Sequence, residues 1–158
     1  MRQLDVFNLT AGIAEFDRYH RSRMNRICHY VGIPVIAIVV LGAMARVGGD
    51  VAIGPWVIRV DLAICVLLLT LLFDLRLNWQ LASGIFASGL LAYAVGIFLP
   101  LVSLAGLFVI GWVLQIVGHR LFEKNSPAFV DNLVHFYIGP RWLINRFIRA
   151  VDAGEAVS

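Results

Sequence analysis

Four long apolar segments dominate the sequence and restrict the fold to one class. They lie at about residues 27–44, 57–73, 80–99 and 101–118. A helix needs about 20 apolar residues to cross the roughly 30 Å hydrocarbon core of a bilayer, because it rises only about 1.5 Å per residue. The chain of 158 residues is 60% hydrophobic and 15% charged, whereas soluble domains carry about 25% charged residues. We therefore predict an all-α integral membrane protein, a polytopic bundle of four transmembrane helices in a single domain, residues 1–158.

Amphipathic segments flank the four spans. Residues 8–25 place Ile13 and Phe16 on one side of a helix, and residues 127–150 mix basic with large apolar side chains. We predict that both are interfacial helices on the cytoplasmic side. Ser126 and Pro127 suit the start of the second one, and we expect Gly139 and Pro140 to interrupt it. The glycine-rich stretch 46–56 predicts a turn.

The basic residues indicate the topology. With four spans, only Arg46 and Arg59 fall on one side, which leaves eleven of the 13 Lys and Arg residues on the other. The positive-inside rule then places both termini in the cytoplasm. The polar N-terminal segment has no signal-peptide core. We expect location in the bacterial inner membrane, or in the endoplasmic reticulum if the chain is eukaryotic. The basic residues lack the aromatic interleaving of a nucleic-acid surface.

Two further patterns concern packing. Small residues recur at four-residue steps in the third span, which predicts close contact with another helix; they are Gly84, Ser88, Ala92 and Gly96. Cys28 and Cys65 lie in or beside apolar segments, far apart in the sequence, and we expect no disulfide between them. The second and third spans carry no polar cluster, so we interpret them as scaffold. An oligomer is compatible with all of these features.

A polar stripe crosses the end of the fourth span. In a helix, its four residues fall within a sector of roughly 80°; they are Trp112, Gln115, His119 and Glu123. His119 and Glu123 are four residues apart, a spacing that lets two side chains reach one metal ion. Polar groups at membrane depth are costly and usually serve function. The alternative is ordinary interfacial charge, because the pair lacks the specificity of a signature with several ligands.

All four histidines are predicted at the cytoplasmic ends of the spans: His20, His29, His119 and His135. His20 and His29 point about 180° apart on a straight helix, so they can meet at one ion only if the chain breaks between them. We draw a ligand set of His20, His29 and His119, with Glu123 as fourth ligand or as a hydrogen-bond acceptor behind a ligand. His135 is the weaker candidate. Iron would favour oxygenase chemistry and zinc hydrolysis, and spacing alone does not choose between them.

Two blocks of residues resemble a known family. One block runs from Tyr19 to Pro34 and contains Tyr19, His20, Asn25, His29, Gly32, Ile33 and Pro34. The other contains Gly111, Trp112, Gln115, Gly118, His119, Phe122, Glu123, Lys124, Pro127, Ala128, Asp131, Asn132, Leu133, Gly139 and Pro140. Together they resemble the fungal 2-hydroxy-fatty-acid dioxygenases of the endoplasmic reticulum and their bacterial relatives.

The resemblance implies Fe(II)-dependent α-oxidation without 2-oxoglutarate. A 2-hydroxy long-chain fatty acid and O₂ would give the fatty acid shorter by one carbon. It implies that His20, His29 and His119 ligate the iron, and Glu123 matches as well. For the substrate we expect contacts from residues along the same boundary: Tyr19, Asn25, Trp112, Gln115, Arg120 and Lys124. Basic side chains suit a carboxylate there.

The sequence departs from the family pattern at two positions. Arg21 stands where some members have a second histidine, and His135 stands where the fungal pattern has a glutamine. Two other functions remain open: a non-enzymatic membrane scaffold or transport protein, and a zinc-dependent lipid hydrolase. Four histidines are too few for the histidine-rich boxes of di-metal lipid hydroxylases and desaturases. A transporter would carry polar groups near the midplane of its spans.

Overall fold

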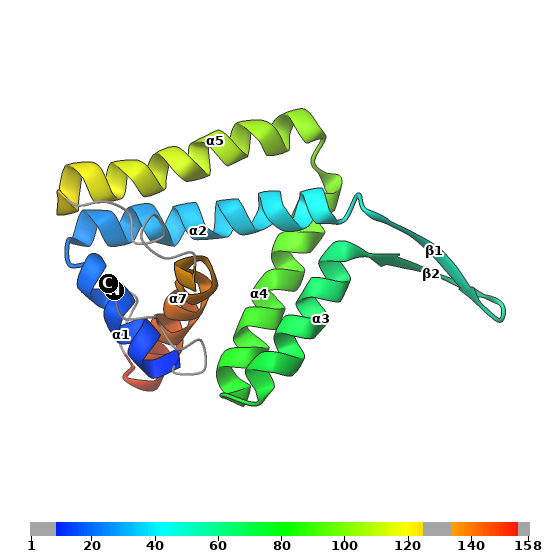
Figure 1. Cartoon of the computed structure of the whole chain (residues 1–158), viewed down its shortest axis with the longest axis horizontal. Coiled ribbons are helices and arrows are strands. Elements are labelled where there is room, and N and C mark those ends of the chain that lie inside the picture. Colours follow the sequence, from blue (N-terminus) through cyan, green and yellow to red (C-terminus); the bar gives the residue numbers. More distant parts are fainter. Residues whose placement is uncertain (1–8, 125–133, 155–158) are drawn as a thin grey trace. The chain divides into compact units, whose positions relative to one another are not determined.

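The structure is a computed structural model that describes residues 9–124 and 134–154, which are predominantly helical as predicted. The elements are α1 (Leu9–Tyr19), α2 (Arg23–Met44), β1 (Gly48–Ile53), β2 (Trp56–Asp61), α3 (Leu62–Leu75), α4 (Trp79–Phe98), α5 (Leu101–Val117), the π-helix η1 (Gly118–Glu123) and α7 (Val134–Asp152) (Figure 1). The predicted helix start at Ser126 and Pro127 lies outside the described residues.

Among the described residues, three helical segments are long and apolar enough to cross a membrane. They are α2 with 22 residues, α4 with 20, and α5 continued by η1 with 23. They match the first, third and fourth predicted spans. The helix of the second predicted span, α3, has 14 residues, or about 21 Å at the usual rise per residue. Four crossings therefore remain a prediction.

The second predicted span begins differently in the structure, because residues 57–61 form a strand instead of a helix. β1 and β2 pair as an antiparallel hairpin, from Gly48 opposite Asp61 to Ile53 opposite Trp56. Val57, Ile58 and Val60 are β-branched and favour strands, and Gly54 turns the chain at a positive φ of 60°. The α-helix starts only at Leu62, where the Asp61 side chain accepts a hydrogen bond from the Ile64 amide at 3.0 Å.

The described residues belong to two compact units. The first, which we call the histidine unit, comprises Met1–Ile33 and Gly111–Ser158. Within it, α1 packs against α7 (Figure 1), around a core of Ile13, Phe16, Ile138 and Trp142. The helices approach closely at Gly12, where an added Cβ would lie 2.8 Å from Cδ1 of Ile138.

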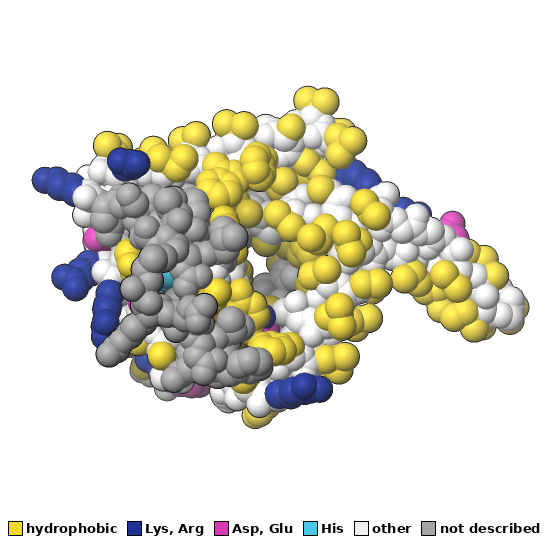
Figure 2. Space-filling view, viewed as in Figure 1, with side chains coloured by type: hydrophobic (Ala, Val, Ile, Leu, Met, Phe, Trp, Pro, Cys, Tyr) yellow, Lys and Arg dark blue, Asp and Glu magenta, His cyan; other side chains and the backbone are white. Residues whose placement is uncertain are grey.

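The second unit, which we call the apolar unit, is Pro34–Ile110. α3 and α4 lie side by side in it, over a core of Leu41, Ala45, Ala63, Leu67 and Ala92. Of the small-residue stripe, Ala92 and Gly96 are buried, and Gly96 meets the backbone of Gly42 on α2, whereas Ser88 is exposed. Many apolar side chains lie on the face of this unit that Figure 2 shows. Both cysteines are free, as expected.

Further features of the helices also differ from the predicted ones. The first amphipathic helix ends at Tyr19, not at Asn25, and α2 begins at Arg23. α7 runs through Gly139 and Pro140 without interruption. Proline removes one helical hydrogen bond, but Ile138 and Trp142 on either side of Pro140 are buried in the core and hold both turns together. α2 likewise continues through Pro34. The interfacial location of α1 and α7 remains a prediction.

Candidate metal centre

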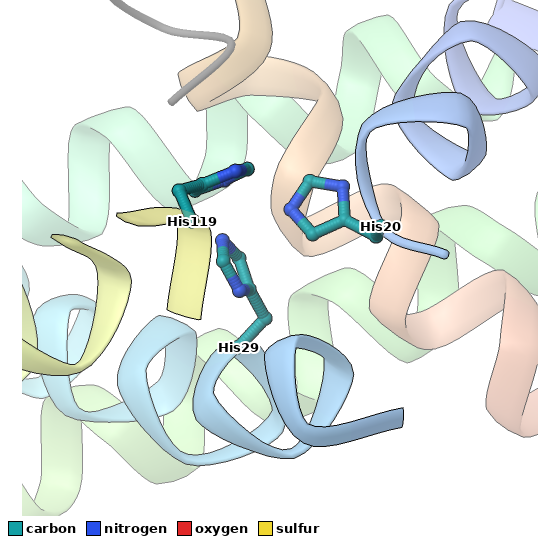
Figure 3. A group of neighbouring side chains, drawn as sticks. All are labelled: His20, His29 and His119. Atoms are coloured by element: carbon teal, nitrogen blue, oxygen red, sulfur yellow. The ribbon is translucent and has the colours of Figure 1, made fainter. Parts of the chain in front are cut away.

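Three segments of the histidine unit each supply one imidazole to a common cluster. His20 follows the last residue of α1, His29 lies on α2, and His119 lies on η1. One ring nitrogen from each lies within 4.8 Å of those of the other two. Figure 3 shows the three rings turned toward one another. Their relative exposures are only 1%, 2% and 1%, so the cluster is closed to bulk water.

The chain brings His20 and His29 together by breaking between two helices. α1 ends at Tyr19 and α2 begins at Arg23. The centroids of the two rings are 4.2 Å apart. On one continuous helix, nine residues would place the two rings on opposite sides. The helix break that we predicted to be necessary for His20 and His29 to share one site is therefore present.

The backbone fixes how two of these rings point. Nδ1 of His20 lies 2.7 Å from the carbonyl oxygen of Phe16, and Nδ1 of His29 lies 2.9 Å from that of Asn25. A carbonyl only accepts, so Nδ1 carries the proton in each ring and Nε2 keeps its lone pair. Within the described part of the chain, the buried Nε2 of His20 has no hydrogen-bond partner.

Burial also keeps His20 neutral. Loss of hydration, followed by repulsion from the nearby His29, lowers the pKa of His20 from 6.5 to about 2. The hydrogen bond to Phe16 opposes this shift without cancelling it. At neutral pH the ring is therefore uncharged, with a proton on Nδ1 and a lone pair on Nε2, which is the state that binds a metal ion.

The arrangement fits an ion that prefers imidazole ligands. Metal–nitrogen bonds of about 2.1 Å place two ligands of one ion at most about 4.2 Å apart, close to the observed 4.8 Å limit. The three nitrogens would therefore have to move closer together to bind one ion. Three imidazoles leave positions open for other ligands, which is typical of catalytic rather than structural sites.

Glu123 lies behind this cluster. Its Oε1 accepts hydrogen bonds from the Ser22 amide at 2.6 Å and from Nδ2 of Asn25 at 3.2 Å. Among the described residues, the group of mutually close ligand atoms contains the three histidines without Glu123. The contacts show Glu123 closing the turn between His20 and α2 and holding Asn25, whose carbonyl orients His29. Its predicted role as a ligand is not tested by this geometry.

His135 is a neighbour of the cluster. It is 4% exposed and lies on α7, with its ring 5.9 Å from Phe16 and 5.8 Å from Tyr19, centroid to centroid. It is not in the group of three. Tyr19, the first of the predicted substrate contacts, thus lies beside the histidines.

The other predicted substrate contacts divide by exposure. Asn25 and Gln115 are buried, and Gln115 packs against Gly32 of α2. Trp112 is partly buried and packs edge-on against Phe136. Arg120 and Lys124 are exposed. The structure therefore brings Tyr19, Asn25 and Gln115 near the cluster and leaves the two cations at its surface.

Three residues at the site were missed by the sequence analysis. The ring of Phe16 stacks on His20 with centroids 4.1 Å apart. Trp142, 0% exposed, lies 5.3 Å from His20, and its Nε1 donates to Oδ1 of Asp17 at 2.6 Å. Trp142 follows His135 by seven residues and so shares its helix face. The position of Trp142 beside His135 could have been predicted from the sequence only if the helix had been expected to continue through Pro140.

Comparisons with known proteins identify the family of the chain. The family described as "2-hydroxy-palmitic acid dioxygenase Mpo1-like" matches residues 7–151, which confirms the predicted family. A curated relative, 2-hydroxy-palmitic acid dioxygenase MPO1 of Saccharomyces cerevisiae, is 48% identical over 44 residues. That segment is 27% of this chain and 25% of the yeast protein, so the match spans a quarter of the relative's length. No solved structure is significantly similar to the chain.

Proposed function

Because the chain belongs to the 2-hydroxy-palmitic acid dioxygenase Mpo1-like family, we propose that it is an Fe(II)-dependent dioxygenase of 2-hydroxy fatty acids. The reaction is α-oxidation: the bond between C1 and C2 breaks, and the 2-hydroxy acid and O₂ give the fatty acid shorter by one carbon, CO₂ and water, with no 2-oxoglutarate. The name of the yeast relative supports a 2-hydroxy fatty acid as substrate. The proposed location is the cytoplasmic face of the membrane, with both termini on that side.

One observation carries the proposal: three buried imidazoles meet at one point, and two of them are oriented by backbone carbonyls. Burial of three titratable rings in contact is expensive unless they bind something. A structural role would be served more cheaply by apolar side chains. His20, His29 and His119 are the residues that would hold the ion.

Each surrounding residue has a defined task. A bound ferrous ion would supply the redox chemistry that O₂ requires. Asn25 and Glu123 hold the turn that carries His20 and the carbonyl that orients His29. Arg120 and Lys124, exposed beside the site, would attract the carboxylate of the substrate. Phe16 and Trp142 cover His20 with apolar rings and limit water around it.

The first experiment is the metal content of the detergent-purified protein after iron reconstitution. We expect about one iron per chain in the wild type, the stoichiometry of a single three-histidine site, and none in His119→Ala. His135→Gln is the matched control, since it alters a buried histidine outside the group of three and should keep the iron.

Oxygen uptake with 2-hydroxypalmitate then tests the reaction. Uptake that follows iron content across the three proteins would support the proposal. Iron-loaded protein without uptake, or turnover unchanged in His119→Ala, would contradict it. Zinc as the stable occupant, with lipid hydrolysis, would favour the hydrolase. No metal in any variant would favour a scaffold.

A further inference from the structure

The β-hairpin of the apolar unit carries its charged side chains on one face, together with Ala52 and Val57, and only apolar residues on the other. Side chains alternate along a strand, and directly paired residues of antiparallel strands share a face. The register therefore groups Gly49, Val51, Ile53, Trp56, Ile58 and Val60 on one face. We call this the hairpin apolar face. Its large side chains are 40–71% exposed, with Trp56 at the tip the most exposed of them.

The opposite face carries the charges. Asp50 pairs with Arg59 in the register, and their side chains form an ion pair with N and O 3.6 Å apart. Asp61 lies on the same face at the base. Every charged residue of the two strands is thus on one face. The other face is apolar, and nothing in the described structure covers it. That separation suits a boundary between water and an apolar medium.

The base of the hairpin lies at the level where two candidate spans end. β1 begins four residues after Met44, the last residue of α2. Between them, Arg46 donates hydrogen bonds to the carbonyl oxygens of Gly42 near the end of α2 and Leu99 after α4. The charged group of Arg46 thus binds carbonyl groups at the C-terminal ends of two apolar helices. A charged side chain at such helix ends is expected at the edge of the hydrocarbon layer, where it can reach water.

The base is also fixed to the helices. The Leu62 amide donates to the Val47 carbonyl at 2.8 Å. The hydroxyl group of Tyr93 on α4 donates a hydrogen bond to Oδ2 of Asp61 at 2.8 Å. β2 continues into α3 without an intervening residue. The hairpin therefore has little freedom to move away from the level of the helix ends.

We propose that the hairpin lies in the membrane interface with its apolar face against lipid. An isolated two-stranded hairpin is marginal in water, and an exposed apolar strand pair invites aggregation. Contact with lipid removes both problems. Trp56 suits this location because tryptophan is enriched at membrane–water interfaces, and the Asp50–Arg59 pair then faces the head groups and water. The proposal does not depend on the metal centre or on catalysis.

Two adjacent positions on β1 give a matched test. Val51 lies on the apolar face and Ala52 on the charged face, and both are exposed. Each is replaced by cysteine in the full chain after Cys28→Ala and Cys65→Ala, labelled with a nitroxide, and placed in phospholipid vesicles. Because both sites are on the surface, the substitutions leave the fold intact.

Relaxation by O₂, which concentrates in lipid, is compared with relaxation by a water-soluble nickel chelate. We expect the Val51 label to be several-fold less accessible to nickel and more accessible to O₂ than the Ala52 label. Equal nickel access at both positions would place the hairpin in water and overturn the proposal. Spin–spin broadening at Val51 that disappears on dilution with unlabelled protein would assign the face to a second copy and also overturn it.

Discussion

At the scale of single residues, hydrogen bonds to the backbone orient two histidine rings of the metal centre without a bound ion. Two imidazole Nδ1 atoms donate to carbonyls four residues earlier, and one carboxylate, that of Glu123, closes the turn between them. Such supporting contacts set metal affinity without touching the metal.

Substitution of Glu123 distinguishes its two possible roles. If it only supports the site, Glu123→Ala should weaken iron binding by about 10–100-fold, and excess iron should restore full occupancy. Titration of the metal-free protein measures this, with the exposed Asp152→Asn as control. An alanine variant that no concentration of iron can fill would show that Glu123 is itself a ligand.

His20 makes the stability of the metal-free protein depend on pH. Unfolded His20 takes up a proton near pH 6.5, whereas in the folded protein its pKa is about 2. Between these values the unfolded state holds more protons, so stability falls as pH drops below 6.5 and is flat above it. Unfolding temperatures in detergent from pH 8 to pH 4 should show this slope, and His20→Gln should reduce it. Equal slopes would contradict the assignment.

The sequence allowed the clustered histidines to be predicted, but not the residues that pack around them. The three clustered histidines could be selected because ionisable residues in an apolar chain are rare and informative. Trp142, Phe16 and Asp17 could not, because aromatic and acidic residues in an amphipathic segment look the same whether they face a site or lipid. Only the packing of α1 on α7 separates these cases.

At the scale of elements, the π-helix η1 positions His119 by lying close to α2. A Cβ on Gly118 would collide with the Asn25 side chain and lie 3.1 Å from Cβ of Cys28. Single-turn π-helices often occur at functional sites. The sequence predicted a helix here but not its π form.

Gly118→Ala tests this contact. The variant should lose about 1–3 kcal/mol of stability from overpacking and bind iron more weakly. Gly106→Ala on α5 is the control, because an added Cβ there meets nothing within 4 Å; it should gain about 0.5–1 kcal/mol from helix propensity. Unfolding and iron titration of both proteins provide the measurement. Similar effects of the two substitutions would show that Gly118 does not set the site.

The hairpin illustrates another limit of sequence reasoning. Residues 57–61 directly precede a long apolar run and contribute Val57, Ile58 and Val60 to it, so the predicted span included them despite Arg59 and Asp61. Their β-branched side chains and the turn at Gly54 favour strands, but periodicity over so short a run does not separate the two states. Hydropathy located the apolar segments and could not show where the helix begins.

At the scale of the whole molecule, the number of crossings remains to be measured. If only the three longest apolar segments cross, the termini lie on opposite sides; if α3 crosses as well, they lie on the same side. We expect the same side, because eleven of 13 basic residues, all except Arg46 and Arg59, then fall in the cytoplasm.

Reporter fusions at each end of the full chain measure this topology. A fluorescent protein, active inside, and a phosphatase, active outside, should both report cytoplasmic termini. Opposite results at the two ends would limit the crossings to three and would show that α3 does not span the bilayer. The metal content of each fusion confirms that it has folded.

The break between α1 and α2 has a consequence for how the sequence can change over evolution. One residue inserted in the first turns of α2, before His29, would rotate that ring by about 100° away from His20. The segment from His20 to His29 should therefore accept substitutions but no change of length. An insertion at the exposed hairpin turn, Gly54 and Pro55, displaces nothing in either core. We expect homologous chains to differ in length at the turn and to agree between the two histidines.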